Sequence, residues 1–375
     1  MTEIYLIRHM QAEGNLYIVM QGHWDGDVTA LGLRQAELLG ERFRALPVDA
    51  LYSSDLYRAR LTAAAIQKYH DLPLRTDKRL REINVGRWEG RFFGDLLHEE
   101  PESVNMYMNC PDEWHMDGAE NEADVMARAF PALREIAEEN GGRTAVVVSH
   151  GVTIRCLLRA ALGMTRGEQK KLPIASNTAV TRLLYENGVF RADYINDSAH
   201  LEPLHLPPWG RTPVLRAEPL DVLREGDWYA DCYAAAWRAA HGSLRGFQPE
   251  PYLKSAAEHA RMDPASVLRF TCDGEPMGLL ELDVKRGQGA GYGWISLLYL
   301  SPAYRNRGLG IQLLGRAIMR YKELGRHALR LHAAAENAPA LAFYRKWGFE
   351  ELSEESRALG KLLLLEKKWG GDRHV

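Results

Sequence analysis

A proline-rich segment divides the chain of 375 residues into two halves. Between Leu201 and Pro213 it contains four prolines and one glycine. Proline fixes its own φ and pushes the preceding residue toward extended conformations, so neither a long helix nor a central strand fits there. Because an ordinary domain takes roughly 100–200 residues, the sequence predicts one domain over 1–200, a linker over 201–213 and a second domain over 214–375.

The composition is that of a folded protein, with 46% hydrophobic and 26% charged residues, which excludes disordered chains and coiled coils. A formal net charge of −3 gives no electrostatic basis for binding nucleic acid or an anionic membrane. No apolar run approaches the roughly 20 residues that span a bilayer. The first residues lack the basic stretch of a signal peptide, and four well-separated cysteines fit reduced thiols. We expect a soluble, cytoplasmic protein without nucleic-acid or membrane partners; its oligomeric state is not indicated.

The first half alternates short apolar runs with helical patterns. Three of these runs predict buried strands, namely Ile4–Ile7, Leu51–Ser54 and Thr144–Ser149. Helical spacing of apolar residues follows the first two runs, with Thr29 as the predicted N-cap of the first helix. This alternation predicts an α/β domain with a largely parallel sheet between two helical layers. Ligands of such sheets bind beyond the carboxyl ends of the strands.

Charged side chains gather at these predicted strand ends. Arg8 and His9 follow the first strand, and His150 follows the third. Arg58 lies shortly after the second strand, and the loop before residue 83 adds Glu82. Arg60 is a second arginine on the same predicted helix, but at two residues' distance its side chain points elsewhere. Together these groups predict a functional site, because one parallel sheet would gather its histidines, arginines and glutamate at the same edge.

The motifs around these residues resemble the histidine phosphatase (phosphoglycerate-mutase-like) superfamily over roughly residues 1–200. In the family's order they are Arg8-His9-x-x-x-x-x-Asn15, Gln21-Gly22, Thr29-x-x-Gly32-x-x-Gln35-Ala36, Ser53-Ser54-Asp55-Leu56-x-Arg58-Ala59-x-x-Thr62-Ala63, Leu80-x-Glu82-Ile83-x-x-Gly86-x-Trp88-Glu89-Gly90 and Ser149-His150-Gly151. The resemblance implies a phosphoglycerate-mutase-like three-layer α/β/α fold.

The resemblance also implies roles for single residues. His9 would be the nucleophile that forms a phosphohistidine, which water then hydrolyses. Arg8, Arg58 and His150 would hold the transferred phosphoryl group, and Glu82 would protonate the leaving alkoxide before activating the water. The residues that would bind phosphate or substrate are Asn15, Gln21 and Gly22. We expect hydrolysis of a small-molecule phosphate ester rather than a mutase reaction.

The chain departs from the family directly after the Arg-His pair. Met10 stands where the family has glycine or another small residue, and Gln11 where an acid is common. Glycine at such a turn allows unusual φ values and a close approach of the backbone to the phosphate. Met10 therefore raises the alternative that the first domain is a degenerate phosphatase, which binds a phosphorylated ligand without hydrolysing it.

A glycine-bearing turn is the main feature of the second half. The predicted strand Gly293–Leu300 leads into Arg305–Gly310, which opens a helix that Gly325 ends. Free amides at a helix N-terminus suit a pyrophosphate. A dinucleotide-binding fold would need a third glycine, which is absent.

This half is similar to the GNAT acetyltransferase family over roughly residues 214–368, which implies an α+β acyl-CoA N-acyltransferase fold. The matching motifs are Leu215-Arg216-Ala217, Arg305-x-x-Gly308-x-Gly310 and Asn337-x-x-Ala340-x-x-Phe343-Tyr344-x-x-x-Gly348-Phe349. The resemblance implies acetyl-CoA as cosubstrate. Its pyrophosphate would bind the backbone of Arg305, Asn306, Arg307, Gly308, Leu309 and Gly310, and its pantetheine arm would contact Leu298, Leu300 and Asn337.

Two further groups concern the transfer itself. Tyr344 would protonate the departing thiolate, and Glu281 is a candidate base for the acceptor amine. Trp228, Tyr229, Tyr233 and Trp237 line an acceptor pocket or, at a spacing near four, pack in the core. No zinc-type spacing occurs, and His200 and His205 have no Cys or acidic partner at such a distance, so we expect no metal.

The sequence as a whole favours a bifunctional enzyme, a histidine phosphatase followed by an N-acetyltransferase. The main alternative is an acetyltransferase that carries a degenerate, ligand-binding phosphatase domain.

Overall fold

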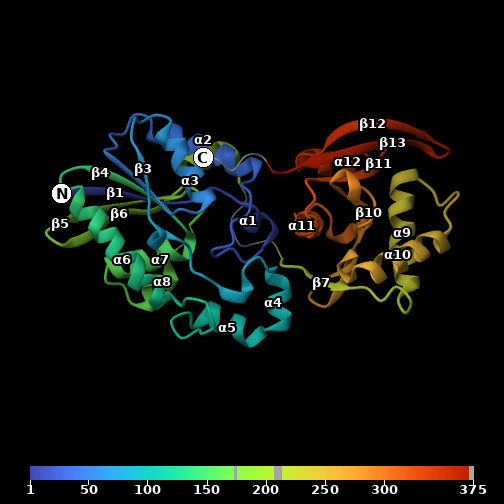
Figure 1. Ribbon diagram of the computed structural model, residues 1–375, viewed down its shortest axis with the longest axis horizontal. Helices are drawn as coiled ribbons and strands as arrows, with labels where there is room; N and C mark the ends of the chain where they lie inside the picture. The colour runs from blue at the N-terminus through green and yellow to red at the C-terminus, as the bar shows by residue number, and fades with distance from the viewer. Residues whose placement is uncertain (173–174, 207–212, 371–375) are drawn as a thin grey trace. The chain divides into compact units, whose positions relative to one another are not determined.

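The computed structural model describes residues 1–172, 175–206 and 213–370 (Figure 1). The chain divides between residues 211 and 212 into two compact units. Four residues of the predicted linker, 201–204, belong to the 3-10 helix η3 (Ala199–Leu204), in which Leu201 is buried. Residues 207–212 of that linker lie outside the described residues.

The N-terminal unit contains a six-stranded sheet in the order β3-β2-β4-β1-β5-β6. Its strands are β1 (Thr2–Arg8), β2 (Ala50–Ser53), β3 (Leu74–Thr76), β4 (Thr144–Ser149), β5 (Val180–Glu186) and β6 (Val189–Asp197). The first four strands of that order run parallel, whereas β5 pairs antiparallel with both of its neighbours, β1 and β6. The predicted, largely parallel sheet is confirmed.

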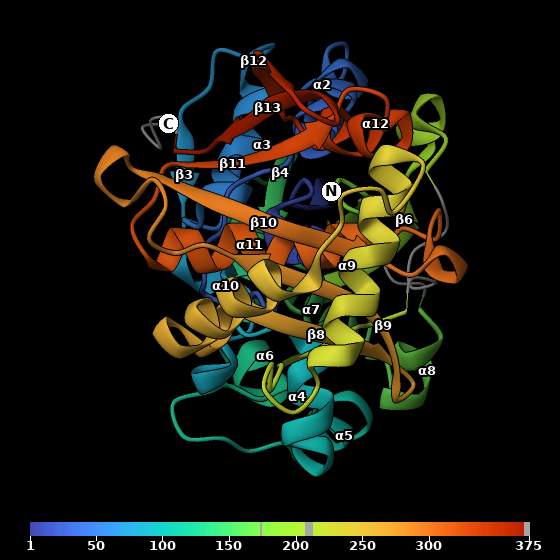
Figure 2. The same ribbon diagram turned by 90° about the vertical axis from the view of Figure 1, so that its right-hand side faces the viewer.

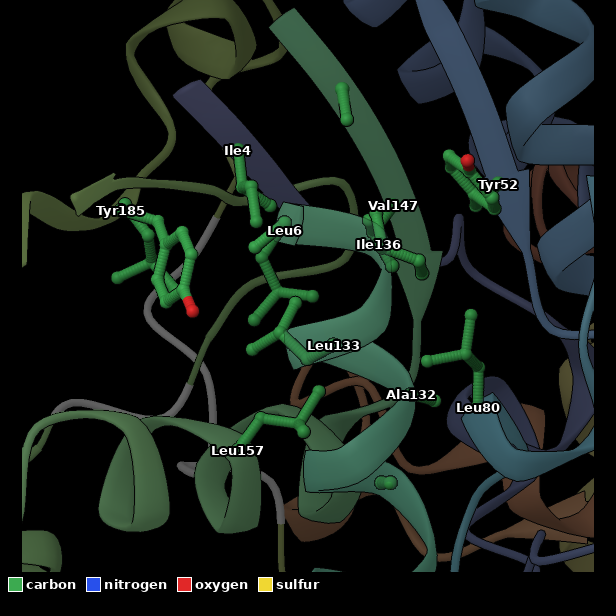
Figure 3. Packing of buried hydrophobic residues seen from close by; sticks show 14 of the residues in the cluster. Ile4, Leu6, Tyr52, Leu80, Ala132, Leu133, Ile136, Val147, Leu157 and Tyr185 are labelled. Carbon is green, nitrogen blue, oxygen red and sulfur yellow. The ribbon is translucent and has the colours of Figure 1, made fainter. Parts of the chain in front are cut away.

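Helices cover both faces of this sheet, because its central strands are apolar on both sides. Ile4 and Leu6 pack with helices α6 (Glu122–Glu139) and α7 (Gly151–Ala161), as Figure 3 shows. Tyr5 and Ile7 point to the opposite face and pack with α2 (Ala30–Phe43) and α3 (Tyr57–Gln67). The three-layer α/β/α architecture is therefore confirmed.

Shorter elements complete the unit. They are α1 (Glu13–Tyr17), η1 (Lys78–Leu80), η2 (Gly86–Trp88), α4 (Phe93–Glu99), α5 (Pro101–Asn109) and α8 (Arg166–Lys171). Thr29 caps α2 as predicted, since its hydroxyl accepts a hydrogen bond from the Gly32 amide at 2.9 Å.

The C-terminal unit contains a seven-stranded sheet in the order β12-β13-β11-β10-β9-β8-β7. Its strands are β7 (Arg216–Pro219), β8 (Val267–Cys272), β9 (Glu275–Leu282), β10 (Tyr292–Leu300), β11 (Ala328–Ala334), β12 (Glu350–Arg357) and β13 (Gly360–Lys368). The helices are α9 (Gly226–His241), α10 (Pro249–Met262), η4 (Pro264–Ser266), η5 (Gln288–Ala290), η6 (Pro302–Tyr304), α11 (Gly310–Glu323) and α12 (Ala338–Lys346).

Helices α9 and α10 lie on one face of this sheet, in front of the strands in Figure 2. Helix α11 packs on the other face, where Tyr321 lies against Gly293 and Leu313 against Gly278. Glycine is required at position 293, because a Cβ there would collide with the Tyr321 ring. Across the described residues, every helix falls short of the length and apolar character needed to cross a bilayer.

Strands β10 and β11 form the only parallel pair among the described strands of this sheet, and the pair is short. It joins Tyr292–Trp294 to Ala328–Arg330 and ends there, although both strands continue. A β-bulge between Ile295 and Leu297 accompanies the separation. The two strands thus diverge and leave facing backbone edges unpaired.

Candidate functional site

The first site lies where β1 and β4 end side by side. Their parallel register pairs Arg8 with Ser149, and the His9 amide donates to the Ser149 carbonyl at 2.9 Å. His9 and His150, the next residues along each strand, have ring centroids 5.1 Å apart. Both rings are buried, His9 with only 2% of its surface exposed. The structure therefore brings these two predicted residues together.

The tautomer of His9 is set by its own loop. Its Nδ1 lies 2.6 Å from the carbonyl oxygen of Met10, and because a carbonyl only accepts, Nδ1 is the donor. Burial, together with the charges of Arg58 and Arg8, holds the pKa of His9 well below 6.5. The ring is therefore neutral at physiological pH, with the lone pair on Nε2.

His150 has the same electrostatic character. Burial lowers its pKa well below 6.5, and Arg58 and His9 lower it further. Both ring nitrogens are buried without a hydrogen-bond partner among the described residues. Buried polar atoms of this kind need a partner, so they mark a place where a polar ligand fits.

Two buried arginines face the histidines. Burial lowers the pKa of Arg8 to about 10, although Glu82 opposes this, so the guanidinium stays charged at neutral pH. Arg58 lies at the start of α3 and donates to Asp25 Oδ1 at 3.0 Å and to the Gly22 carbonyl at 2.8 Å. These bonds fix the guanidinium of Arg58 against the loop that carries Gly22.

Glu82 lies at the N-terminus of α7. Its Oε1 accepts from the Thr153 amide at 3.0 Å, and its Oε2 from the Val152 amide at 3.2 Å. A Cβ on Gly151 would lie 3.5 Å from Arg8 Nε and 3.7 Å from Glu82 Oε2. Carboxylate, arginine and the His150 strand end are thus neighbours, as the sequence predicted.

The three predicted phosphate- or substrate-binding residues form the loop over these groups. Asn15 Oδ1 accepts from the Ala12 amide at 3.0 Å, and Gln21 Oε1 accepts from the Gly14 amide at 3.0 Å. A Cβ on Gly22 would collide with the Ile83 carbonyl oxygen and with Glu89 Oε1, so only glycine fits. Asn15 and Gln21 therefore shape the loop, while their amide groups still offer N–H donors.

Met10 does not need the freedom of glycine in this fold. Its φ is not in the left-handed region, its side chain is fully buried, and its amide donates to Thr62 Oγ1 at 2.9 Å. Its carbonyl is the group that orients His9, and any residue supplies a carbonyl. The strained turn that would demand glycine is therefore absent at Met10.

Sequence reasoning did not single out two residues that support this site. Asp25 binds Arg58, and Asn177 Nδ2 donates to the His9 carbonyl at 2.9 Å and lies 3.3 Å from Asn15 Oδ1. Asn177 precedes β5, far from the other motifs in sequence. Only the polar run Ser176-Asn177-Thr178 before an apolar strand could have drawn attention to it.

In the C-terminal unit, the predicted pyrophosphate loop is exposed and turns sharply. Asn306 has φ 59° and Gly308 has φ 75°, and residues 305–308 are exposed. Helix α11 begins at Gly310, and the first amides of a helix have no acceptor within it. Arg307 and Leu309 lie in the same turn, so backbone donors face solvent next to the helix N-terminus.

The remaining predicted cosubstrate residues lie on β10 and α12. Leu298 and Leu300 are half-buried on the part of β10 that has separated from β11. Asn337 caps α12, with its Oδ1 accepting from the Ala340 amide at 3.3 Å. Tyr344 is buried between Phe343 and Phe349, and burial raises its pKa, so its hydroxyl stays protonated.

Glu281 is sealed inside the domain. Only 2% of its surface is exposed, and its oxygens accept from the Tyr229 hydroxyl at 2.6 Å and from His259 Nδ1 at 2.8 Å. Tyr229 itself is fully buried among apolar residues of α9 and the sheet. Within the described parts of the chain, no group of three or more His, Cys, Asp or Glu side chains is arranged to hold a metal ion.

Comparison with known proteins adds family matches for both units. Residues 4–198 match the model of the histidine phosphatase superfamily (branch 1), and residues 227–349 match that of the acetyltransferase (GNAT) family. The second match implies the use of an acyl-CoA.

Individual proteins are similar over about half of the chain. The probable phosphoglycerate mutase GpmB of Yersinia pestis (strain Pestoides F) is 31% identical over 207 residues, which cover 54% of this chain and 96% of that protein. The protein of the same name from Salmonella choleraesuis (strain SC-B67) is 30% identical over 207 residues, which cover 54% of this chain and 96% of that protein. The structure of Bacillus stearothermophilus YhfR aligns with a TM-score of 0.52 and 30% identity. The alignment covers 54% of this chain and 100% of that one.

Proposed function

The chain belongs to the histidine phosphatase superfamily (branch 1), and from this premise we propose that its N-terminal domain hydrolyses phosphate monoesters through a phosphohistidine at His9. We further propose that its C-terminal domain, which matches the GNAT family, transfers an acetyl group from acetyl-CoA to an amine. The observation that carries the first proposal is a neutral, buried His9 of fixed tautomer beside two charged arginines.

The geometry supports a two-step reaction in the first domain. The Nε2 lone pair of His9 attacks the phosphorus, the bond to the ester oxygen breaks, and the carboxyl group of Glu82 donates a proton to the leaving alkoxide. A water then attacks the phosphohistidine, the nitrogen–phosphorus bond breaks, and Glu82 takes a proton from that water. Phosphate leaves, and His9 and Glu82 return to their starting states.

The cations support the same reaction electrostatically. The transferred phosphoryl group spreads negative charge over three oxygens, and fixed donors stabilise it without reorganising. Arg8 and Arg58 supply planar donors that are already buried, and the unpartnered nitrogens of His150 offer further contacts. We assign hydrolysis rather than phosphoryl transfer to a second substrate.

The proposed acetyl transfer uses mainly backbone. The turn at Gly308 and the N-terminus of α11 would bind the pyrophosphate, and the free edge of β10 would pair with the extended pantetheine arm. The amine nitrogen attacks the thioester carbonyl, the carbon–sulfur bond breaks, and Tyr344 donates a proton to the thiolate.

The phosphatase proposal is tested with para-nitrophenyl phosphate in the absence of added metal. Wild-type protein should release nitrophenol and form an acid-labile phosphoprotein, whereas His9→Ala should do neither. His98→Ala, which removes an exposed histidine of α4, is the matched control and should behave like wild type. Ester binding without turnover in the wild type would instead support the degenerate, ligand-binding alternative.

The acetyltransferase proposal is tested by calorimetry with acetyl-CoA and with acetyl phosphate as a control. Acetyl-CoA should raise the melting temperature of the C-terminal domain, because a ligand that binds only the folded state stabilises it. Thiol release should then depend on an added primary amine. No stabilisation at saturating acetyl-CoA would contradict this part of the proposal.

A further inference from the structure

The mouth of the gap between β10 and β11 carries a second His–Glu pair. The last paired residues of the two strands are Trp294 and Arg330. His332 lies two residues further along β11, so its side chain is on the same face as that of Arg330. Its ring meets the Trp294 ring edge-on, with centroids 5.0 Å apart. His332 therefore lies where the strands begin to diverge.

Glu355 on β12 orients the ring of His332. Strand β13 lies between β11 and β12, and Glu355 Oε1 is 3.3 Å from His332 Nε2. Because a carboxylate only accepts, Nε2 is the donor and Nδ1 carries the free lone pair. The side chain of His332 remains 19% exposed, so the ring is partly accessible to a ligand.

The surroundings of His332 keep the ring neutral. Burial is the main cause that lowers its pKa below 6.5; Glu355 acts in the opposite direction. Arg286, which lies over the Trp294 ring, and Arg357 on β12 lower the pKa further. A neutral imidazole that is held by a carboxylate can accept a proton at physiological pH.

The pair formed by His259 and Glu281 lacks these properties. Glu281 already accepts two hydrogen bonds and is sealed from solvent. Burial alone would lower the pKa of His259, but the hydrogen bond and charge of Glu281, with the charge of Asp283, raise it. His259 thus tends to hold a proton rather than to accept one, and its Nε2 lies 3.7 Å from the carboxylate of Asp283.

We propose that His332, oriented by Glu355, accepts the proton of the acceptor ammonium in the acetyltransferase domain. The inference rests on the proposed acetyl transfer and names its base. An N–H bond of the ammonium breaks and an N–H bond forms at His332 Nδ1. The freed amine attacks the thioester, and the thiolate takes a proton from Tyr344. The second proton lost by the nitrogen restores Tyr344, so one proton per turnover passes from His332 to solvent.

The test follows kcat/KM against pH with acetyl-CoA and whichever of lysine, spermidine and glucosamine the wild type acetylates fastest. His332→Gln should lower kcat by about 10²–10⁴-fold and remove the acidic limb below 6.5 that belongs to the imidazole. Its KM for acetyl-CoA should stay within about twofold, because base catalysis and cosubstrate binding are separate. Glu355→Gln should move that limb to lower pH, because the charge that raises the pKa of His332 is gone.

Glu354→Gln is the matched control. Residue 354 precedes Glu355 on β12, and its partner is the exposed Lys361, so the same loss of charge should leave the pH profile unchanged. An acidic limb that survives in His332→Gln, or that moves in Glu281→Gln, would overturn the proposal.

An NMR titration of the His332 ring in the full chain gives a readout that needs no amine. The ring should titrate below 6.5 in the wild type and lower still in Glu355→Gln. A titration above 6.5, or one that is indifferent to Glu355→Gln, would overturn the assignment of the base. Failure of acetyl-CoA to stabilise the wild type would overturn acetyl transfer itself, which is a separate result.

Discussion

The two candidate sites are built from different parts of the chain. In the N-terminal domain, five buried side chains carry the candidate site, namely Arg8, His9, Arg58, Glu82 and His150. In the C-terminal domain, the proposed acyl-CoA site would consist of an exposed turn at Gly308, a helix N-terminus and the free edge of β10. One site therefore depends on which side chains are present, and the other on the path of the backbone.

This difference follows from the ligands. A phosphoryl group in transfer carries its charge on the three oxygens of one small group, and buried cations stabilise it most strongly because water does not screen them. The pantetheine arm and pyrophosphate of an acyl-CoA are extended, and repeated backbone donors match their length. Removal of single side chains should thus disable the phosphoryl site, whereas acyl-CoA binding by the second domain should respond mainly to distortion of the backbone.

Among the substitutions that test this difference in ligand binding, Arg58→Ala should have the largest effect. The substitution removes a charge from the phosphoryl site and releases Asp25 and the Gly22 carbonyl, which the guanidinium holds. We expect kcat/KM for para-nitrophenyl phosphate to fall by about 10²–10³-fold. Arg60→Ala is the control on the same helix and should cost less than about tenfold, because residues two apart on a helix point in different directions. A larger loss for Arg60→Ala would reassign the phosphate-binding arginine.

A backbone change should have the next largest effect. Gly308 has φ 75°, which a β-branched residue adopts only under strain of about 1–3 kcal/mol. At 1.4 kcal/mol per tenfold, Gly308→Val should weaken acetyl-CoA binding by about fivefold to 150-fold in calorimetry. Gly289→Val is the control, because Gly289 has no positive φ and open space around it. Equal losses in both variants would argue against a site formed by the backbone.

The two domains should also respond differently to acid, because the C-terminal domain combines a histidine whose pKa is raised, His259, with one whose pKa is lowered, His332. The pKa of His9 and of His150 lies well below 6.5 in the folded state, so the unfolded chain binds more protons below that pH. The N-terminal domain should therefore lose stability as pH falls from 6.5, by about 1.4 kcal/mol per pH unit for each histidine until its folded pKa is reached.

In the C-terminal domain the pKa of His259 is raised, so its contribution is complete below 6.5 and is lost as pH rises through the folded pKa. The measurement is scanning calorimetry from pH 7.5 to pH 5.5, roughly the range over which histidines titrate. It should follow the melting temperature of each domain. His150→Gln should lower the acid sensitivity of the N-terminal domain by about a quarter, because the pKa values of His9, His23 and His200 are lowered there as well. An unchanged pH slope in that variant would contradict a buried, neutral His150.

The same contrast explains what could be predicted from the sequence. The alternation of strands and helices predicted the three-layer fold, and the order of β1 and β4 placed His9 beside His150, because parallel strands end at the same edge. Asp25 and Asn177 could not be predicted, since they come from loops whose path no local pattern fixes.

The proposed base of the second domain shows another limit of prediction from the sequence. Alternation correctly placed Glu281 within β9, but which strand face is buried under α9 and α10 depends on packing, and the structure seals it. The His332–Glu355 pair spans β11 and β12 across β13, and only the register of three strands brings it together. The pattern of a single strand can be read from the sequence, but the register that brings His332 to Glu355 cannot.

Arg305→Ala should have the smallest effect and is the sharpest test of the comparison. Its side chain is exposed, and its Nε donates to the Leu300 carbonyl at 2.8 Å. If backbone amides hold the pyrophosphate, loss of this side chain should change the Kd of acetyl-CoA by less than about threefold, since exposed ion pairs contribute only about 0–1 kcal/mol. The small loss should vanish at high salt, which screens exposed charges. If Arg305→Ala weakened acetyl-CoA binding more than about tenfold and Gly308→Val hardly changed it, the second domain would also bind its ligand through side chains.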